Sequence, residues 1–477
     1  MALKDDLSAI LGVDYVTDDP EILGNYASDW SPVQPRRPDL VCRPGSTEEV
    51  QKVVKYANDR SIPVTPRSSS VGYYGGGIPS QGGIILDLSR MNKILQIDPR
   101  NKKVKIEAGV TWSQVQTEAA KAGMMVCSPL LPHLAKSVVT SALEREPIII
   151  PKTEYSDQVL SQELVLANGE LFWTGTALGK AMKDQCFPDA FVPGARLWNG
   201  AQGTLGITTW ANIKAEFLPV KDKAFFIAFD RLSDLIEPLY RIERRMLGYE
   251  CFALNRINLA AILAGGIGGD FDKLKDKLPN WTVILILSAL DYLPDEKIAY
   301  EEEALEEIAK ALKLKPVHTL AGITGLDAKL PAMLRKPWAG DTYWKHRHTG
   351  ASADIFFHTT LDRAAEFEDA INKAAPKFGL KASDIGGYLQ PIDRARAGFL
   401  QFGLHYHPEN KAEAIRAKDL HRQASETVAN MGGFFTTPYG QWADLVFSHT
   451  AGYTNTLKIV KDAYDPKHIL NPGKLCF

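Results

Sequence analysis

The chain has 477 residues, of which 45% are hydrophobic and 23% are charged, and its formal net charge is -2 with a pI of about 6.6. Its length predicts more than one domain, because single hydrophobic cores rarely grow beyond roughly 250–300 residues. The near-neutral charge gives no reason to expect a nucleic acid or an anionic membrane as a partner, since no net positive field attracts phosphates.

The N-terminus and the cysteines indicate the cellular compartment. The first residues contain no apolar segment of the kind that forms a signal peptide. The apolar stretch 281–290 is shorter than the roughly 20 residues that a transmembrane helix needs. The cysteines are scattered without Cys-x-x-Cys spacing, which favours reduced thiols over a metal or iron–sulfur site. We therefore expect a cytoplasmic protein with no transmembrane segment.

Residues 39–66 predict a strand–helix–strand unit. Residues 39–42 form a short apolar strand, and Ser46 and Glu49 have the spacing of a helix capping box. Apolar residues at positions 50, 53, 54 and 57 then lie on one face of a helix. Residues 62–65 are again typical of a strand.

Further along the chain, two segments, 83–88 and 104–109, predict strands. After Pro219 longer helical patterns appear, notably at 295–314, so we expect a domain boundary near residue 218. The glycine-rich segment 264–269 is expected to be a flexible loop, because it lacks the preceding strand that a dinucleotide-binding loop requires.

A loop rich in serine and glycine follows the strand–helix–strand unit. Small residues let consecutive backbone N–H groups surround a phosphate, and serine hydroxyls add donors. No Gly-Lys-Ser/Thr follows, so the loop is not a Walker A motif. Taken alone, it could equally be a mobile surface loop. The candidate phosphate-binding residues are Pro66, Arg67, Ser68, Ser69, Ser70, Val71, Gly72 and Tyr73.

Five segments in chain order carry a family resemblance. They are the stretch from Tyr74-Gly75 through Ile84-Ile85-Leu86-Asp87-Leu88, the segment 137–145, the segment 157–175, the glycine cluster 200–207, and the terminal Ile469-Leu470-Asn471-Pro472-Gly473-Lys474. Together they resemble the FAD-linked oxidoreductases of the vanillyl-alcohol oxidase and 4-cresol dehydrogenase superfamily, which share a PCMH-type FAD-binding domain. Each motif alone is modest, but the order of the five is specific.

The resemblance implies an α+β fold in three parts. Residues 1–218 would form the PCMH-type FAD-binding domain, residues 219–455 an α+β cap domain for the substrate, and residues 456–477 a C-terminal segment that completes the FAD-binding domain. Backbone amides and hydroxyls would neutralise the pyrophosphate of FAD. Besides the first loop, the cofactor-binding residues would be Ser137, Thr140, Ser141, Arg145, Gly203, Thr204, Gly206, Ile207, Asn471 and Lys474.

The flavin is expected to be bound non-covalently. Many members of this superfamily attach it to a histidine of the first loop, but residues 67–77 contain none. Others attach it through a His or Tyr of the cap; a loose alignment puts Asp354 at that position, with His358 nearby.

Two branches of the superfamily suggest different substrates. For oxidation at the benzylic carbon of para-substituted phenols, Tyr74 and Tyr439 match the two phenol-binding tyrosines, and Asp157 is a further candidate catalytic residue. The arginine that usually follows the second tyrosine is Gly440 here, so Arg347 would have to supply the positive charge.

For oxidation of D-2-hydroxy acids, Trp344-Lys345-His346-Arg347 is similar to the Trp-x-x-Arg of that branch, whose arginine would clamp a carboxylate. The metal ligands of that branch are largely missing. His405 and His407 are spaced to share one face of a strand, but no carboxylate accompanies them, so no metal is expected.

We therefore expect an FAD-dependent dehydrogenase acting on a small aromatic substrate, with a hydroxy acid as the alternative substrate and a flavin-binding subunit with a degenerate site as the second alternative. The chain has no haem-attachment or cluster motif, so an electron-transfer protein such as a cytochrome is the expected acceptor. A homo- or hetero-oligomer, a dimer for example, is also expected.

Overall fold

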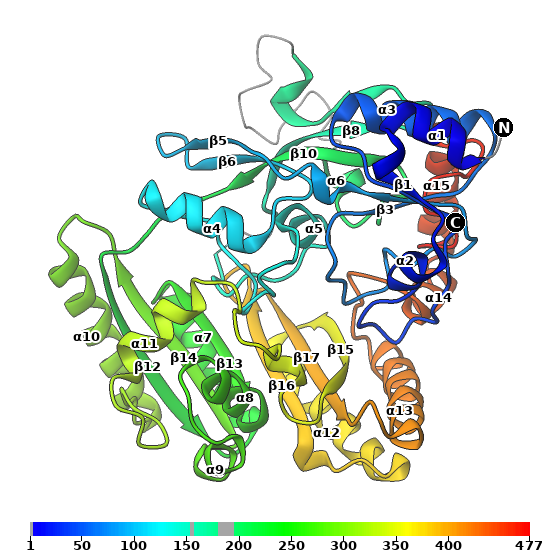
Figure 1. Cartoon of the computed structure of the whole chain (residues 1–477). Helices are drawn as coiled ribbons and strands as arrows, with labels where there is room; N and C mark the ends of the chain where they lie inside the picture. The colour runs from blue at the N-terminus through cyan, green and yellow to red at the C-terminus, as the bar shows by residue number, and fades with distance from the viewer. Residues whose placement is uncertain (1–2, 153–156, 180–194) are drawn as a thin grey trace.

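The computed structural model describes residues 3–152, 157–179 and 195–477 (Figure 1). Two sheets of the N-terminal half lie at the top of the view, and a larger sheet formed by the middle of the chain lies below them. Cys186 and residues 153–156 lie outside the described residues.

The first sheet has the strand order β1-β2-β4-β3, and β2, β4 and β3 run parallel. Its strands are β1 (Val16–Thr17), β2 (Leu40–Cys42), β3 (Val64–Arg67) and β4 (Ile84–Asp87). Helix α3 (Thr47–Asp59) links β2 to β3, and the Ser46 side chain caps it by accepting a hydrogen bond from the Glu49 amide. Its predicted apolar face is buried, as amphipathic spacing requires. The strand–helix–strand prediction is confirmed.

The second sheet is antiparallel, with the order β5-β6-β10-β8-β9. Its strands are β5 (Ile94–Asp98), β6 (Lys103–Glu107), β8 (Val159–Val165), β9 (Leu171–Trp173) and β10 (Ile207–Lys214). Helices α4 (Trp112–Lys121) and α5 (Val138–Leu143) pack against it through a buried apolar cluster. The remaining short elements of this half are α1 (Leu3–Leu11), α2 (Pro20–Asn25), α6 (Ala195–Trp198), β7 (Met124–Met125) and β11 (Glu216–Phe217).

The third sheet has six antiparallel strands in the order β12-β14-β13-β16-β17-β15. They are β12 (Lys221–Phe229), β13 (Glu250–Asn255), β14 (Trp281–Ala289), β15 (Ala351–Thr359), β16 (Ile385–Ile392) and β17 (Ala397–Tyr406). The helices around this sheet are α7 (Ile236–Arg244), α8 (Arg256–Gly266), α9 (Phe271–Lys277), α10 (Pro294–Leu312), α11 (Leu326–Leu334), α12 (Ala364–Ala374) and α13 (Lys411–Asn430).

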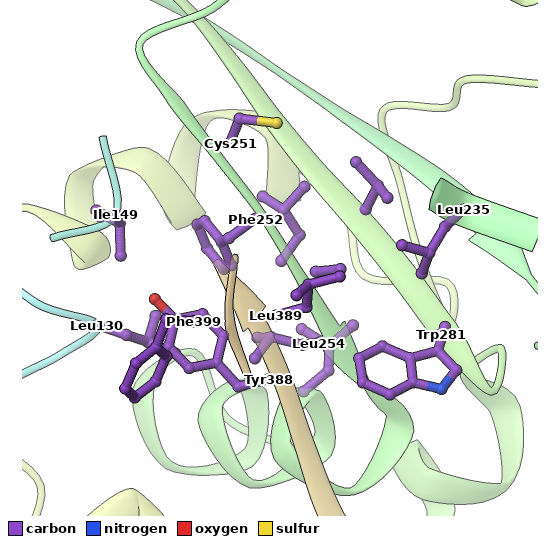
Figure 2. Close-up of a cluster of buried hydrophobic side chains, with 14 of the residues drawn as sticks. Leu130, Ile149, Leu235, Cys251, Phe252, Leu254, Trp281, Tyr388, Leu389 and Phe399 are labelled. Carbon is purple, nitrogen blue, oxygen red and sulfur yellow. The ribbon is translucent and has the colours of Figure 1, made fainter. Parts of the chain in front are cut away.

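The N-terminal half and the third sheet share one hydrophobic core. Figure 2 shows Leu130 and Ile149, from the connection between α4 and β8, beside Phe252, Tyr388 and Phe399 of the third sheet. These side chains are at least 94% buried, so separating the two parts would expose large apolar surfaces to water. The shared core therefore fixes how the two parts face each other.

The C-terminal segment returns to the N-terminal sheets. Helix α14 (Gln441–Ser448) is followed by α15 (Ala451–Tyr464), drawn in red (Figure 1), and Tyr464 at the end of α15 packs against Trp198. The ammonium of Lys461, which is completely buried, donates to the Thr204 carbonyl at 2.7 Å and to the Leu470 carbonyl at 2.9 Å. The Val64 amide of β3 donates to the Ile469 carbonyl at 2.7 Å.

The prediction of a loop at residues 264–269 is partly wrong, because helix α8 continues to Gly266. A Cβ atom on Gly265 would lie 2.6 Å from Trp338 Cη2, and one on Gly266 would lie 2.1 Å from Met333 Sδ. Tertiary packing thus overrides the poor helix propensity of glycine, since only glycine lets these side chains lie against the helix. None of the helices in the described ranges is long and apolar enough to cross a membrane.

Candidate active site

Two large cavities meet at a wall of three tyrosines. The first encloses about 1020 Å³ and is lined by residues from both N-terminal sheets and from α5. The second encloses about 1290 Å³ and is lined by residues 30–34, by β15 and by helices α13 and α14. Tyr73, Tyr74 and Tyr439 line both cavities. A molecule in the first cavity can therefore contact a molecule in the second across these rings.

The serine-rich loop forms one wall of the first cavity. The Arg67 guanidinium donates to the Ser69 carbonyl at 3.2 Å and to the Ser70 carbonyl at 3.1 Å, which closes the loop on itself. The Ser68 and Thr140 hydroxyls hydrogen-bond each other across the cavity wall. Arg67 Nη1 is buried and has no partner in the described part of the chain. A buried N–H of a guanidinium without an acceptor is costly, so this atom indicates an anionic ligand.

Glycines allow the loops to approach each other closely. Gly203 has a φ of +71°, and a Cβ there would lie 2.4 Å from Pro66 Cγ. A Cβ on Gly76 would lie 2.8 Å from Tyr439 Cε1. Glycine is therefore needed at both positions, at Gly203 for the turn and at Gly76 for the tyrosine ring.

The predicted cofactor residues divide into two groups. Those that line the first cavity are Pro66, Arg67, Ser68, Ser69, Val71, Gly72, Tyr73, Thr140, Gly203, Gly206 and Ile207. Those that do not line it are Ser70, Ser137, Ser141, Arg145, Thr204, Asn471 and Lys474.

Most residues of the second group support the loops from behind. Lys474 donates to the Gly75 carbonyl at 2.9 Å, and Asn471 donates to the Gly76 carbonyl at 3.0 Å and to the Gln202 carbonyl at 2.7 Å. The other supporting bonds are Ser137 to the Ala108 carbonyl, Trp112 Nε1 to Ser141 Oγ, and Thr204 to the Ala201 carbonyl. Ser70 and Arg145 are exposed.

The tyrosine pair rests on a buried cluster of charges. The rings of Tyr74 and Tyr439 stack with centroids 5.3 Å apart. The Tyr74 hydroxyl donates to Glu146 Oε1 at 2.8 Å, and the Tyr439 hydroxyl donates to Glu144 Oε1 at 3.3 Å. The Lys136 ammonium, whose side chain is 1% exposed, lies 2.8 Å from Glu144 Oε2 and 2.5 Å from Glu146 Oε1.

Local structure brings this cluster together. Lys136 and Glu144 flank α5, since Ser137 caps its start and Glu144 is its C-terminal cap. Arg145 then adopts a φ of +55°, which turns the chain sharply after the helix. The turn brings Glu146 within reach of the lysine on the other side of the helix.

Burial governs the pKa values in the cluster. It raises the pKa of the Glu144 carboxyl to about 7, although Lys136 opposes the shift. Burial alone would lower the pKa of Lys136, but the two carboxylates raise it above its usual value. Burial and the neighbouring carboxylates raise the pKa of Tyr74 and of Tyr439 well above the usual value, so both tyrosines are neutral.

The second cavity combines aromatic and polar walls. Trp30, Phe356 and Trp442 supply flat apolar surface. The polar wall contains Asp354, which Lys345 contacts at 2.5 Å and which also accepts hydrogen bonds from Ser352 at 2.6 Å and Gln401 at 2.7 Å. His346 and His421 line the cavity too, and burial lowers the pKa of both.

Two predicted catalytic residues lie elsewhere. Residues 344–346 form a single 3-10 turn that leaves Lys345 and His346 at the cavity, whereas Arg347 is not among its lining residues. The Arg347 guanidinium instead faces the Ala264 carbonyl at the end of α8, 3.5 Å away. The Asp157 carboxylate accepts a hydrogen bond from Asn199 at 2.8 Å and lines neither cavity. The geometry therefore does not support the roles expected of Arg347 and Asp157.

His405 and His407, the pair considered as possible metal ligands, lie in different surroundings. His405 is buried, and burial lowers its pKa to about 3. His407 is exposed and contacts Glu413 at 3.1 Å. The described ranges contain no group of three His, Cys, Asp or Glu side chains that could hold a metal ion.

Comparison with known proteins identifies the family. Residues 38–175 match the family model of an FAD binding domain. The chain is 30% identical to a D-lactate dehydrogenase of Archaeoglobus fulgidus over 494 aligned positions, which cover 100% of this chain and 99% of that protein. This chain belongs to the PCMH-type FAD-linked oxidoreductases. A glycolate oxidase subunit of Bacillus subtilis is 26% identical to this oxidoreductase, with coverage of 94% and 91%.

Solved structures confirm the predicted fold of this oxidoreductase. Substrate-bound p-cresol methylhydroxylase has a TM-score of 0.85 at 19% identity, with coverage of 99% of this chain and 96% of that one. A 4-ethylphenol oxidase from Gulosibacter chungangensis, in complex with isoeugenol, has a TM-score of 0.82 at 20% identity, with coverage of 98% and 95%. The protein is an FAD-dependent oxidoreductase with the expected α+β, PCMH-type fold.

The first cavity of the oxidoreductase fits FAD. Its loops offer hydroxyls and small residues, and the unpartnered Arg67 Nη1 would meet an anionic group of the cofactor. Sequence reasoning missed Lys136, Glu146 and the segment 30–34 that lines the second cavity. The sequence shows only that Lys136 and Glu146 flank the segment 137–145. This spacing alone does not predict an ion pair between them.

Proposed function

We propose that this oxidoreductase removes hydride from the benzylic carbon of a para-substituted phenol or a related aromatic alcohol. The observation that carries the proposal is the stacked pair of Tyr74 and Tyr439, which lines both cavities and is hydrogen-bonded to buried glutamates. The aromatic wall of Trp30, Phe356 and Trp442 suits a flat, mostly apolar substrate ring.

The two tyrosines would bind the phenolic oxygen of the substrate. As that oxygen loses its proton, its electron density moves to the para position, which helps the benzylic C–H bond to break as hydride. When bound, FAD supplies the acceptor for this hydride. The aromatic residues of the second cavity would orient the ring and exclude water from the reacting carbon.

Lys136 is a buried cation close to the tyrosines, but two carboxylates offset its charge. Its ammonium lies 5.0 Å from the centre of the Tyr74 ring and 4.6 Å from that of Tyr73. Glu144 and Glu146 hold the Lys136 ammonium there by ion pairs. The family arginine, in contrast, would directly follow Tyr439 in the sequence. Arg347, the residue expected to supply this positive charge, faces the Ala264 carbonyl and is not among the lining residues of the second cavity.

A D-2-hydroxy acid is the second candidate substrate. The sequence relatives named above favour it, and Lys345 gives the second cavity a cation that a carboxylate could approach. A substrate carboxylate would have to compete with Asp354 for this lysine, because the ion pair is already formed at 2.5 Å. We therefore rank the phenol first.

We also propose that FAD is bound without a covalent link and that an external protein accepts its electrons. The described lining residues of the first cavity include no histidine or cysteine, and the hydroxyls of two of its tyrosines, Tyr74 and Tyr439, are hydrogen-bonded to Glu146 and Glu144. His358 lines a third, smaller cavity, and Asp354 is engaged by three hydrogen bonds.

Anaerobic bleaching of the flavin absorbance tests the substrate assignment. The purified protein is mixed with 4-alkylphenols, 4-hydroxybenzyl alcohols, D-lactate, glycolate and D-2-hydroxyglutarate in separate experiments. We expect the phenolic compounds to bleach the flavin. Bleaching by a hydroxy acid alone would reverse the ranking, and bleaching by none of them would favour a flavin-binding subunit.

A further inference from the structure

The hydrogen bonds of the tyrosine pair have a defined direction. Each hydroxyl has one hydrogen, and Tyr74 gives its hydrogen to Glu146 while Tyr439 gives its hydrogen to Glu144. Each tyrosine oxygen can then only accept a further hydrogen bond. A phenolic substrate that reaches Tyr74 must therefore donate its own hydrogen, so the site is arranged to receive a proton from the substrate.

We propose that Glu146, supported by Glu144 and Lys136, is the base that takes the hydroxyl proton of the substrate through Tyr74. The inference rests on the proposed function, because it requires a phenolic hydroxyl. In the step, the substrate O–H bond breaks and its electron pair stays on the substrate oxygen. The proton joins the Tyr74 oxygen while the proton of Tyr74 passes to Glu146 Oε1. Tyr74 is neutral before and after.

The charges of the cluster favour this transfer. One lysine and two carboxylates sum to a net charge of -1, and a gained proton makes the cluster neutral. Phenols ordinarily have a pKa of about 10, which is well above that of a carboxyl group. Before hydride is lost, proton transfer from the phenol to a carboxylate is therefore unfavourable. Departure of hydride from the benzylic carbon, which is attached at the para position, leaves the ring short of electrons and makes the hydroxyl strongly acidic. Transfer is therefore expected together with hydride loss.

Other titratable groups of the described residues face the tyrosine pair or Glu146: Tyr73, Tyr343 and Asp29, whose carboxylate faces Tyr439 and accepts a hydrogen bond from the Gly75 amide. Tyr73 and Tyr343 also face Glu146, but burial raises the pKa of both, and both are neutral. Burial also raises the pKa of Glu144 to about 7, and the Lys136 ammonium donates a hydrogen bond to each of the two glutamates.

A third cavity lies beside the proposed base. It encloses about 500 Å³, and Glu146 lines it whereas Tyr74 and Glu144 are not among its described lining residues. Its other charged or titratable lining residues are Arg145, Lys152, His358 and Asp393. Arg145 is exposed to solvent. Glu146 is thus the member of the cluster that contacts both the tyrosine and this cavity.

The proton balance of ligand binding tests the relay. The probe is 4-hydroxybenzaldehyde, whose electron-withdrawing group makes its hydroxyl acidic and whose ionised form has its own absorption band. It is bound to the FAD-loaded protein in weak buffer with a pH-indicator dye, at a pH below the pKa of the free probe, where the unbound probe is the neutral phenol. We expect the wild type to bind the ionised probe without releasing a proton, because Glu146 retains it. Release of a full proton for each ionised ligand would overturn the proposal.

Variants complete the test. Glu146→Gln keeps an acceptor for Tyr74 and leaves Lys136 paired with Glu144, and Glu144→Gln is its counterpart. We expect Glu146→Gln to bind the probe as the neutral phenol and to reduce its flavin about 10²–10³-fold more slowly with a phenolic substrate. The matched control is Glu368→Gln, a buried carboxyl with a raised pKa that accepts a hydrogen bond from Trp281. This control should behave as the wild type.

The outcomes separate the relay from the proposed function. If 4-alkylphenols bleach the flavin equally fast in the wild type and in Glu146→Gln, with FAD content unchanged, the relay is wrong and the phenol assignment stands. If no phenol bleaches the wild-type flavin, the proposed function itself fails.

Discussion

Replacement of Tyr74 by Phe isolates one hydroxyl of the candidate site. Phe fills the same volume, and its ring can keep the stacking on Tyr439 at 5.3 Å, so the walls of both cavities should be preserved. Only the hydrogen bond to Glu146 and the proposed contact with the substrate oxygen are lost. Any change in rate therefore reports on the hydroxyl itself.

The magnitude follows from the geometry of the two hydrogen bonds. A hydrogen bond to a charged group contributes roughly 1.5–3 kcal/mol, and the 2.8 Å bond of Tyr74 to Glu146 belongs at the upper end. A loss of about 2.7 kcal/mol in the transition state slows flavin reduction roughly 10²-fold. The 3.3 Å bond of Tyr439 to Glu144 is longer, so Tyr439→Phe should slow it only about 10-fold.

Anaerobic stopped-flow reduction of the flavin by a 4-alkylphenol measures both rates, and the flavin absorbance of each variant gives its FAD content. We expect unchanged FAD content in both variants. Rates within about twofold of the wild type in both would show that the tyrosines only pack, and the reasoning about the phenolic oxygen would be refuted.

Four further results are expected. The pKa of Glu144 is raised to about 7, so its carboxylate is lost as the pH falls through 7; flavin reduction by phenols should rise with pH through this value, and in Glu144→Gln the rise should disappear. Arg67→Met should weaken FAD binding at least 10-fold in an equilibrium titration with FAD, because Arg67 Nη1 then no longer meets the anionic group. Arg347→Lys should leave reduction by phenols unchanged, whereas a collapse would point to a carboxylate substrate clamped by Arg347. Acid precipitation should release the flavin into the supernatant; colour in the pellet would reveal a covalent link.

The parts of the structure that depend on local sequence patterns could be predicted. The capped helix after β2 and the serine-rich loop after β3 follow from residue spacing and from small residues that expose backbone amides. The five motifs in order also led to the PCMH-type fold, which the comparisons confirm. Tyr74 and Tyr439 were predicted as a pair by the same resemblance, and their rings do stack.

Features that depend on contacts between distant segments could not be predicted. The 3-10 turn at residues 344–346 decides that Lys345, and not Arg347, reaches the cavity, and no local pattern specifies this direction. Gly265 lies inside a helix because Trp338, more than 70 positions away in the sequence, packs against it. The ion pair of Lys136 with Glu146 likewise depends on the positive φ of Arg145, an uncommon conformation for this residue type.

One measurement tests the central claim most directly: anaerobic flavin reduction by 4-hydroxybenzyl alcohol, compared with the same alcohol carrying deuterium at the benzylic carbon. If hydride leaves this carbon, the flavin should be bleached, and deuterium should slow the bleaching several-fold because the C–H bond breaks in the measured step. Absence of bleaching by either form, together with rapid bleaching by D-lactate, would contradict the account.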